Sequence, residues 1–276
     1  MDVPPDDIEF LVTSDHRVAV LDALATEPRD RNALRTVTGA SSPTMSRILT
    51  DFEERNWIER DGRTYELTGL GAFVADRLAE FVDAMTIEGR LRDVWEWLPH
   101  DLDGFSVDHF SDVMVTLPNP GYPSKPVERR IELITETSNW RGFGVAMLGL
   151  QTLETSFERF LDEDDTFRCE YIYPPAVFEE LLSWGDTETI LEAVDSDSYT
   201  VLLHDDLPTD DRFEICLFDD RVTICCYDHE NGGLQALVET TSADARAWAE
   251  SFYERFREDA QPLDDAFEQG SLASLE

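Results

Sequence analysis

The sequence predicts a two-domain chain of the α+β or α/β class. A small N-terminal domain of helices is closed by a β-hairpin, a linking helix follows, and a larger mixed α/β sheet domain completes the chain. Three observations predict this order. Apolar residues recur at helical spacing before residue 55 and over residues 70–98, two alternating segments surround Asp61-Gly62, and strand-like and helix-like segments alternate beyond residue 105.

The composition indicates that the chain forms packed cores and that it works in concentrated salt. The 276 residues are 42% hydrophobic and 11% aromatic, which excludes a disordered chain despite a net charge of −38. Lys125 is the single lysine among 22 basic residues. A large acidic excess with almost no lysine resembles the proteins of salt-accumulating halophiles, in which concentrated salt screens self-repulsion. The acidity therefore describes the solvent and does not exclude a nucleic-acid partner.

The charge is uneven along the chain. Residues 1–68 carry a net charge of −6, and residues 69–276 carry −32. Between Arg29 and Arg63 there are seven arginines and six acidic residues. Relative to the rest of the protein, this stretch is a basic patch.

The cysteines and the N-terminus indicate a cytoplasmic protein without a zinc site. The four cysteines, Cys169, Cys216, Cys225 and Cys226, form no C-x-x-C motif and lie in apolar segments, where thiols are typically buried. Whether they sense redox state stays open. The acidic start MDVPPDD is not a signal peptide, and no apolar segment is long enough to span a bilayer.

Three short helices are expected first. Residues 6–12 form one, and a second carries Val18, Leu21 and Leu24 at helical spacing and ends near Glu27-Pro28. Asp30 caps the third, which ends at Gly39, a residue suited to a left-handed terminus.

The fourth helix is the element around which the domain is organised. Ser41 or Ser42 caps it and Pro43 suits its first turn. Its buried face is formed by residues at i, i+3, i+4 and i+7: Met45, Ile48, Leu49 and Phe52. The opposite face carries Thr44, Ser46, Arg47 and Thr50, which suit contacts to base edges and phosphates in a major groove. A solvated helix face is the alternative interpretation.

A β-hairpin follows this helix. Residues 57–60 and 63–67 alternate around Asp61-Gly62, a strong two-residue turn signal. Arg60 and Arg63 flank the tip, from which they can reach phosphates or the minor groove, although pairing with nearby acidic residues is an alternative.

These motifs resemble an archaeal winged helix-turn-helix transcription regulator over residues 14–68. The residues that carry the resemblance are Gly39–Ser41, Thr44–Leu49, Phe52–Ile58 and Asp61–Thr68, with Asn56 in place of the usual glycine. The resemblance implies double-stranded DNA as partner, and it implies a homodimer formed through the helix after the hairpin, although that helix can equally pack between the domains. The candidate DNA-binding residues are Ser42, Thr44, Ser46, Arg47, Thr50, Arg60 and Arg63.

The C-terminal region is expected to be a mixed α/β sheet domain. Predicted strands and helices alternate up to about residue 204, and two hairpin-linked strands around Asp219-Asp220, a third strand over 234–240 and a helix capped by Ser242 follow. Residues 125–260 are similar in arrangement to the effector-sensing domain of methanogenesis-regulator-type proteins of haloarchaea. The resemblance implies a small-molecule effector, with Arg141, Phe143 and His204 as candidate contacts.

No catalytic constellation is found. The acidic segment 162–165 lacks the ligand spacing of a calcium loop, His204-Asp205-Asp206 has no second ligand at motif spacing, and Gly142-x-Gly144 is not a dinucleotide fingerprint. We therefore expect no enzyme, cofactor or metal.

The expected domains are 1–68 for DNA binding, 69–104 for linkage or dimerisation, 105–262 for effector sensing, and a tail from 263 to 276. A winged helix that binds only protein is the alternative function.

Overall fold

The computed structural model describes residues 5–144, 150–162, 166–184, 187–208, 213–228 and 233–263. The chain divides into two compact units, Met1–Thr86 and Ile87–Glu276. The acidic segment 162–165, the loop at 229–233 and the tail beyond residue 263 fall wholly or largely outside the described residues. The predicted domain boundaries at residues 68 and 104 stay predictions. The division after residue 86 separates two compact units and does not test where the functional domains begin or end.

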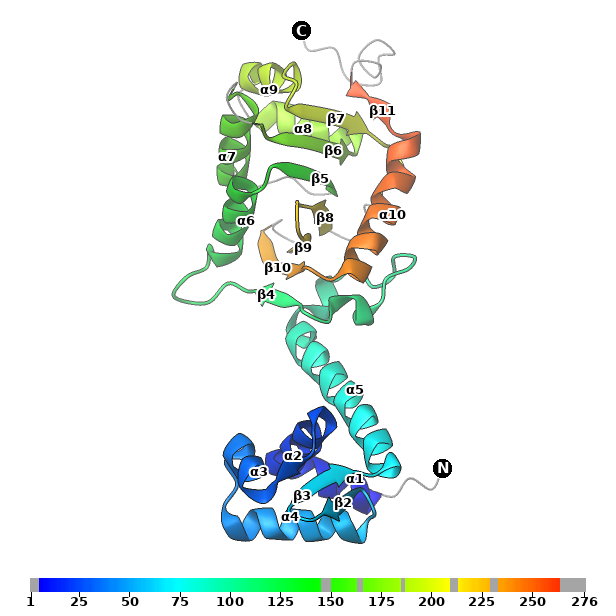
Figure 1. The fold of residues 1–276 in the computed structure, drawn as a ribbon. Helices are drawn as coiled ribbons and strands as arrows, with labels where there is room; N and C mark the ends of the chain where they lie inside the picture. Colours follow the sequence, from blue (N-terminus) through cyan, green and yellow to red (C-terminus); the bar gives the residue numbers. More distant parts are fainter. Residues whose placement is uncertain are drawn as a thin grey trace. The chain divides into compact units, whose positions relative to one another are not determined.

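The first unit is a group of helices closed by a small antiparallel sheet (Figure 1). Its helices are α1 (Pro5–Val12), α2 (Asp15–Thr26), α3 (Arg31–Thr38) and α4 (Ser42–Glu54), and α5 (Gly69–Leu91) begins in it. Its strands are β1 (Arg29–Asp30), β2 (Ile58–Asp61) and β3 (Thr64–Leu67), in the order β1-β3-β2. This arrangement confirms the predicted winged helix-turn-helix.

The ends of α3 and α4 are fixed by the residues that the sequence indicated. The Asp30 carboxylate accepts hydrogen bonds from the backbone amides of Asn32 and Ala33, each at 2.8 Å. Gly39 ends α3 with φ +69°, and the Ser41 hydroxyl accepts from the Thr44 amide at the start of α4. The inner face of α4 is 3% exposed or less: Met45, Ile48, Leu49 and Phe52.

The hairpin turn differs by one residue from the prediction. Asp61 pairs with Thr64 in the ladder, so the two-residue loop is Gly62-Arg63 and not Asp61-Gly62. Gly62 has φ +56°, a conformation in which glycine avoids the strain of a side chain. The shift places Arg63 in the loop itself, while Arg60 stays in the strand opposite Tyr65.

The second unit is a large mixed sheet covered on both faces. Its helices are α6 (Lys125–Glu136), α7 (Leu150–Phe160), α8 (Pro175–Trp184), α9 (Thr187–Val194) and α10 (Ala243–Asp259), with 3-10 helices at Arg92–Trp97 and Val107–Phe110. Its strands are β4 (Met114–Thr116), β5 (Asn139–Gly144), β6 (Arg168–Tyr173), β7 (Tyr199–Leu203), β8 (Phe213–Leu217), β9 (Val222–Tyr227), β10 (Leu234–Thr240) and β11 (Gln261–Pro262).

Parallel and antiparallel pairing meet at β5. The strand order is β11-β7-β6-β5-β8-β9-β10-β4, with β5, β6 and β7 parallel and the remaining pairs antiparallel. Helices α6 to α9 cover one face and α10 the other (Figure 1). Because both faces are covered, every residue of β8 and β9 is buried. The predicted mixed α/β sheet domain is confirmed.

Several element boundaries were wrong. Between Pro175 and Val194 the structure has two helices, α8 and α9, and Gly185-Asp186 between them lie outside the described residues. The helix expected over 68–98 changes to a 3-10 helix after Leu91. The short strands β1, β4 and β11 were not predicted, because two or three residues show no period.

The core of the second unit contains a buried ion pair. Arg130 of α6 is 2% exposed, and its guanidinium forms a bidentate ion pair with Glu214 of β8, whose side chain is fully buried. The hydroxyls of Tyr171 and Tyr227 also donate to this carboxylate. Burial opposes the ionisation of Glu214, but the charge of Arg130 and the hydrogen bonds from Arg130 and Tyr171 together outweigh it and lower the pKa of that carboxyl.

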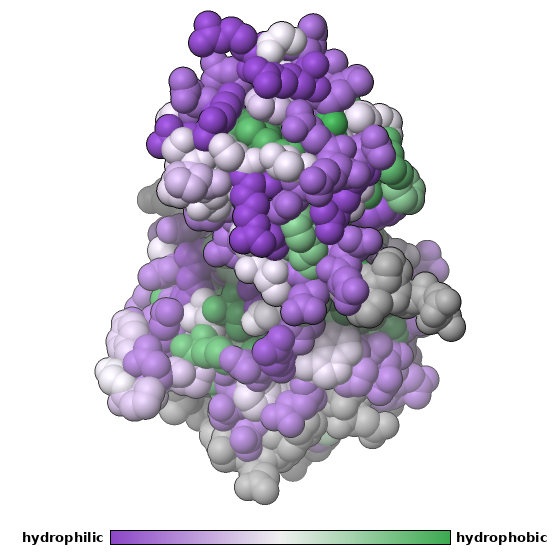
Figure 2. All heavy atoms as spheres, turned by 90° about the horizontal axis from the view of Figure 1, so that it is seen from below, coloured by the Kyte–Doolittle hydropathy of each residue, from purple (hydrophilic) through white to green (hydrophobic). Residues whose placement is uncertain are grey.

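Hydrophilic side chains cover most of the face seen in Figure 2. On the face seen in Figure 2, hydrophobic residues form small separate groups among hydrophilic ones. No helix in the described ranges combines the length and apolar character needed to cross a membrane.

Candidate nucleic-acid interface

The outward face of α4 presents an exposed arginine with one long ion pair. The Arg47 side chain is 80% exposed, and its nearest acidic atom is an Asp51 carboxylate oxygen 4.0 Å from Nε. Thr50 is exposed beside it and Ser46 is half-buried. Since Met45, Ile48 and Leu49 hold the opposite face in the core, Arg47 is directed away from the domain on a rigid helix.

The N-terminus of α4 is held by side-chain hydrogen bonds. Arg31 Nη2 donates to the Ser42 carbonyl oxygen at 2.7 Å and to Ser42 Oγ at 2.8 Å. The hydroxyls of Ser41 and Thr44 lie 2.8 Å apart. Ser42 and Thr44 thus position the helix start, and their hydroxyl oxygens keep lone pairs for a further contact. Arg31 was not predicted, because a contact across eleven residues leaves no periodic signal.

The two hairpin arginines differ in their contacts. Arg60 Nε donates to the Gly62 carbonyl oxygen at 3.0 Å, and its guanidinium carbon lies 5.7 Å from the centre of the Tyr65 ring. Arg63 is exposed in the loop and makes no hydrogen bond or ion pair within the described part of the chain. Arg63 is therefore free to meet a phosphate, whereas Arg60 is partly held by the turn.

The hairpin is anchored to the start of α5. Asn56 takes φ 55°, a left-handed conformation that asparagine tolerates better than most residues. Thr68 Oγ1 donates to the Asn56 carbonyl oxygen at 2.6 Å and accepts from the Gly71 amide at 3.0 Å. A Cβ at Gly71 would lie 1.8 Å from the Trp57 carbonyl oxygen, so only glycine allows this approach. These contacts join the end of α4, the hairpin and the start of α5.

The three predicted effector contacts do not form one site. Arg141 lines an open groove of about 530 Å³ together with Arg168, Arg246 and Glu170. Phe143 is fully buried and packs against Phe213 and Phe252 of the core. His204 is half-buried, and its ring centre lies 5.2 Å from that of Phe256. In this structure Phe143 is a core residue, because alternation along β5 turns it toward α10.

The charges around the Arg141 groove are largely paired. Arg141 Nη1 lies 3.0 Å from Glu254 and Nη2 lies 3.3 Å from Glu250, both on α10. Burial opposes ionisation of Glu170, but hydrogen bonds from Arg257 and Tyr253 outweigh it and lower the pKa of this carboxyl. Arg168, which is exposed, donates only to the Phe167 carbonyl oxygen among the contacts described for its side chain.

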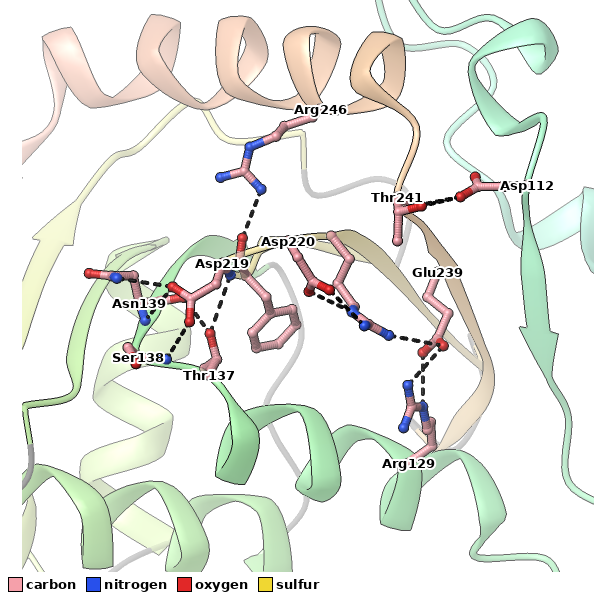
Figure 3. Close-up of polar contacts among 12 residues, drawn as sticks. Asp112, Arg129, Thr137, Ser138, Asn139, Asp219, Asp220, Glu239, Thr241 and Arg246 are labelled. Atoms are coloured by element: carbon pink, nitrogen blue, oxygen red, sulfur yellow. Dashed lines mark hydrogen bonds and ion pairs between the residues drawn. The ribbon is translucent and has the colours of Figure 1, made fainter.

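The β8–β9 turn forms one wall of this groove and ties several elements together (Figure 3). The Asp219 carboxylate accepts from the backbone amides of Ser138 at 2.6 Å and Asn139 at 3.0 Å. Arg246 of α10 donates to the Phe218 carbonyl oxygen at 2.8 Å. Burial opposes ionisation of Asp219, but the hydrogen bonds from Ser138 and Asn139 hold its pKa below the usual range.

A winged helix-turn-helix followed in one chain by a mixed α/β sheet unit defines a class of two-domain proteins. Residues 5–90 match the family model described as the HVO_A0261 N-terminal domain, and residues 123–259 match the model of the middle domain of the methanogenesis regulatory protein FilR1. The resemblance to archaeal winged-helix regulators with a methanogenesis-regulator-type second domain is confirmed.

Three solved structures are similar to this chain at low identity and low TM-score. The archaeal chromatin protein TrmBL2 is 10% identical with a TM-score of 0.42 and covers 94% of this chain and 99% of its own. NucT from Helicobacter pylori is 12% identical with a TM-score of 0.43, covering 55% and 98%. The homodimeric winged-helix domain Mb0332 from Mycobacterium bovis is 24% identical with a TM-score of 0.25, covering 30% and 80%. At these values the likeness carries no information about function. No curated protein sequence matches the chain.

Proposed function

We propose that this chain is a DNA-binding transcription regulator. Helix α4 enters the major groove of double-stranded DNA, and the β2–β3 hairpin contacts the backbone or minor groove beside it. The observation that carries the proposal is the exposure of Arg47. Its side chain is 80% exposed and lies on the outward face of a helix whose inner face is buried. An arginine held in this way is suited to bidentate contact with guanine or to a phosphate.

Hydroxyl groups around Arg47 add hydrogen-bonding groups to the surface that is proposed to contact DNA. Ser42, Thr44, Ser46 and Thr50 lie on the same helix, and Arg60 and Arg63 lie at the hairpin. Hydroxyls accept and donate hydrogen bonds to base edges, so their contribution is less sensitive to salt than that of phosphate contacts. If the protein works in molar salt, as its acidity suggests, counterion release contributes less and these polar contacts contribute more.

The proposed regulator is a homodimer. An apolar stripe on α5, defined as Leu70, Phe73 and Phe81, is exposed by 53%, 63% and 52%. The spacing of these residues places them on one side of the helix, and large apolar side chains gathered there indicate a contact surface. A two-fold contact through this stripe would present two α4 helices to a palindromic site.

The second unit is proposed to hold a small effector in the groove lined by Arg141. The groove has the volume of a small-molecule site and brings together three arginines, Arg141, Arg168 and Arg246. We propose binding without catalysis there, because the sequence contains no recognisable catalytic motif. A regulator of this kind acts in the cytoplasm, in contact with the chromosome.

Selection from a random pool of double-stranded DNA tests the proposal. The full-length protein is incubated with the pool in molar salt, and bound DNA is amplified and sequenced over several rounds. The proposal predicts enrichment of one palindromic motif whose two half-sites lie one helical turn apart or a multiple of it. A correctly folded protein that enriches no motif would contradict DNA binding and favour a winged helix that binds only protein.

A further inference from the structure

A groove of about 690 Å³ runs along α5 within the first unit. Its floor contains Leu21 of α2 and Leu78 of α5, which are 1% and 9% exposed. Its sides include Val82 and Met85 of α5, which are 38% and 47% exposed. The groove is thus apolar and open, and its volume lies in the range of small-molecule sites.

The charged residues that line the groove all carry the same sign. Asp15 and Asp22 come from α2, and Asp76 and Asp83 come from α5; no arginine, lysine or histidine lines it. All four aspartates are exposed, and none forms an ion pair within the described ranges. Some other acidic side chains of this unit are paired, as Asp7 is with Arg55 at 3.2 Å.

We infer that this groove binds a small lipophilic cation. The apolar floor removes the aromatic or aliphatic body of such a ligand from water, and the ring of aspartates attracts its positive charge. A neutral apolar molecule would use the floor but gain nothing from the carboxylates. An anion would be repelled by all four.

The same charges disfavour a second copy of the chain as the occupant. A two-fold contact centred on the groove would bring the four aspartates of one copy against the same four of the other. The stripe of Leu70, Phe73 and Phe81 extends from the N-terminal part of α5, and only Phe81 borders both surfaces. Self-association through the stripe therefore leaves most of the groove free.

A ligand in this groove would act on the relation between α2 and α5. The start of α5 is fixed to the hairpin through Thr68 and Gly71, whereas the groove lies between α2 and the part of α5 from Ala75 to Thr86. A bound cation would wedge these two helices at a fixed angle and so set the spacing of two α4 helices in a dimer. This regulatory consequence rests on the proposed DNA-binding function, but the binding itself does not.

Calorimetry with two ions of matched shape tests the inference. Tetraphenylphosphonium and tetraphenylborate have nearly the same size and opposite charge, and each is titrated into the full-length protein in molar sodium chloride, which screens non-specific attraction. Saturable one-to-one binding of the phosphonium and none of the borate is expected. Equal binding of both ions, or binding of neither, overturns the inference. No DNA is present, so this failure would leave the DNA-binding proposal untouched.

Two variants locate the site. Asp22→Asn with Asp83→Asn should weaken phosphonium binding by about tenfold, because two favourable charge contacts are lost. Glu53→Gln with Glu54→Gln removes the same charge from exposed positions on α4 and should leave the affinity unchanged. Ala79→Trp fills the groove and should abolish binding, with a thermal melt to verify folding. If both double variants weaken binding equally, or if Ala79→Trp alters the oligomeric state in light scattering, the groove is not a cation site.

Discussion

The two units use arginine in opposite ways. In the winged-helix unit, Arg47 is 80% exposed and Arg63 stands free of partners among the described residues. In the α/β unit, Arg130 is 2% exposed and Arg129 of the same helix pairs with Glu239, which is itself 3% exposed. In the first unit these two arginines lie on the surface proposed to bind DNA, whereas in the second unit Arg129 and Arg130 fasten a helix to the sheet. The net charge of −38 for the whole chain does not reveal this difference between the arginines of the two units.

The largest effect is expected where a charge is buried. Glu214→Gln leaves the Arg130 guanidinium buried without its counter-ion, which costs about 3–5 kcal/mol of folding free energy. Denaturant unfolding followed by tryptophan fluorescence measures it. Glu88→Gln, which removes the partner of Arg92 in an exposed pair, should leave the unfolding midpoint unchanged. Equal effects of the two substitutions would show that Arg130 does not brace the second unit.

A smaller but still large effect is expected on self-association. Phe73→Asp with Phe81→Asp places two charges on the apolar stripe, and the dissociation constant of the dimer should rise by about a hundredfold or more. Sedimentation over a range of protein concentrations measures it. Val37→Asp changes a residue of similar exposure, 56%, on α3 and should leave the association intact. A monomeric wild-type protein would remove the basis for the dimer.

Arg47→Ala tests the exposed cation itself. Affinity for the selected DNA should fall by about 1–3 kcal/mol, while the unfolding temperature stays nearly unchanged because the side chain contacts little of the protein. Fluorescence anisotropy and a thermal melt give the two values. Arg77→Ala removes another exposed arginine, which is 59% exposed and pairs with Glu80 on α5, and it controls for charge alone. If both substitutions weaken binding alike, Arg47 is not a reading residue.

The smallest effect concerns a carboxylate in the second unit and depends on pH. Asp219→Asn should destabilise the protein by about 1–2 kcal/mol near neutral pH, because hydrogen bonds to the charged carboxylate are lost. The folded pKa of Asp219 is lowered, so its contribution is present above the unfolded value of 3.8 and is lost as pH falls through the folded value. The difference from wild type should therefore vanish in acid. Asp205→Asn, an exposed control, should leave the stability near neutral pH unchanged.

The sequence predicted local features better than long-range ones. Asp30, Gly39, Ser41 and Ser242 act over three or four residues, and each takes the predicted place at a helix end. The buried face of α4 also followed from its period. The pair of Arg130 and Glu214 joins residues 84 positions apart, and nothing in either neighbourhood indicates it. For the same reason Arg31 was missed beside Ser42.

The two predicted sites also differ in whether their residues are close together in the sequence. The candidate DNA-binding residues lie on one helix and one hairpin, so their proximity could be predicted from helical spacing and from the turn signal. Their contact with DNA stays a prediction. The effector residues come from β5 and from the end of β7, and their neighbourhood depends on sheet order and helix cover. Phe143 proved to be buried because α10, more than 90 residues later in the chain, covers it.

The central claim is that the winged-helix unit binds specific DNA through the exposed arginine of α4. Chromatin immunoprecipitation with sequencing, performed in the native host on the wild-type protein and on Arg47→Ala expressed at equal levels, tests it most directly. The account predicts sharp peaks that share a palindromic motif for the wild type and their loss for Arg47→Ala. Peaks that persist unchanged in the variant, or no peaks for a folded wild-type protein, would contradict it.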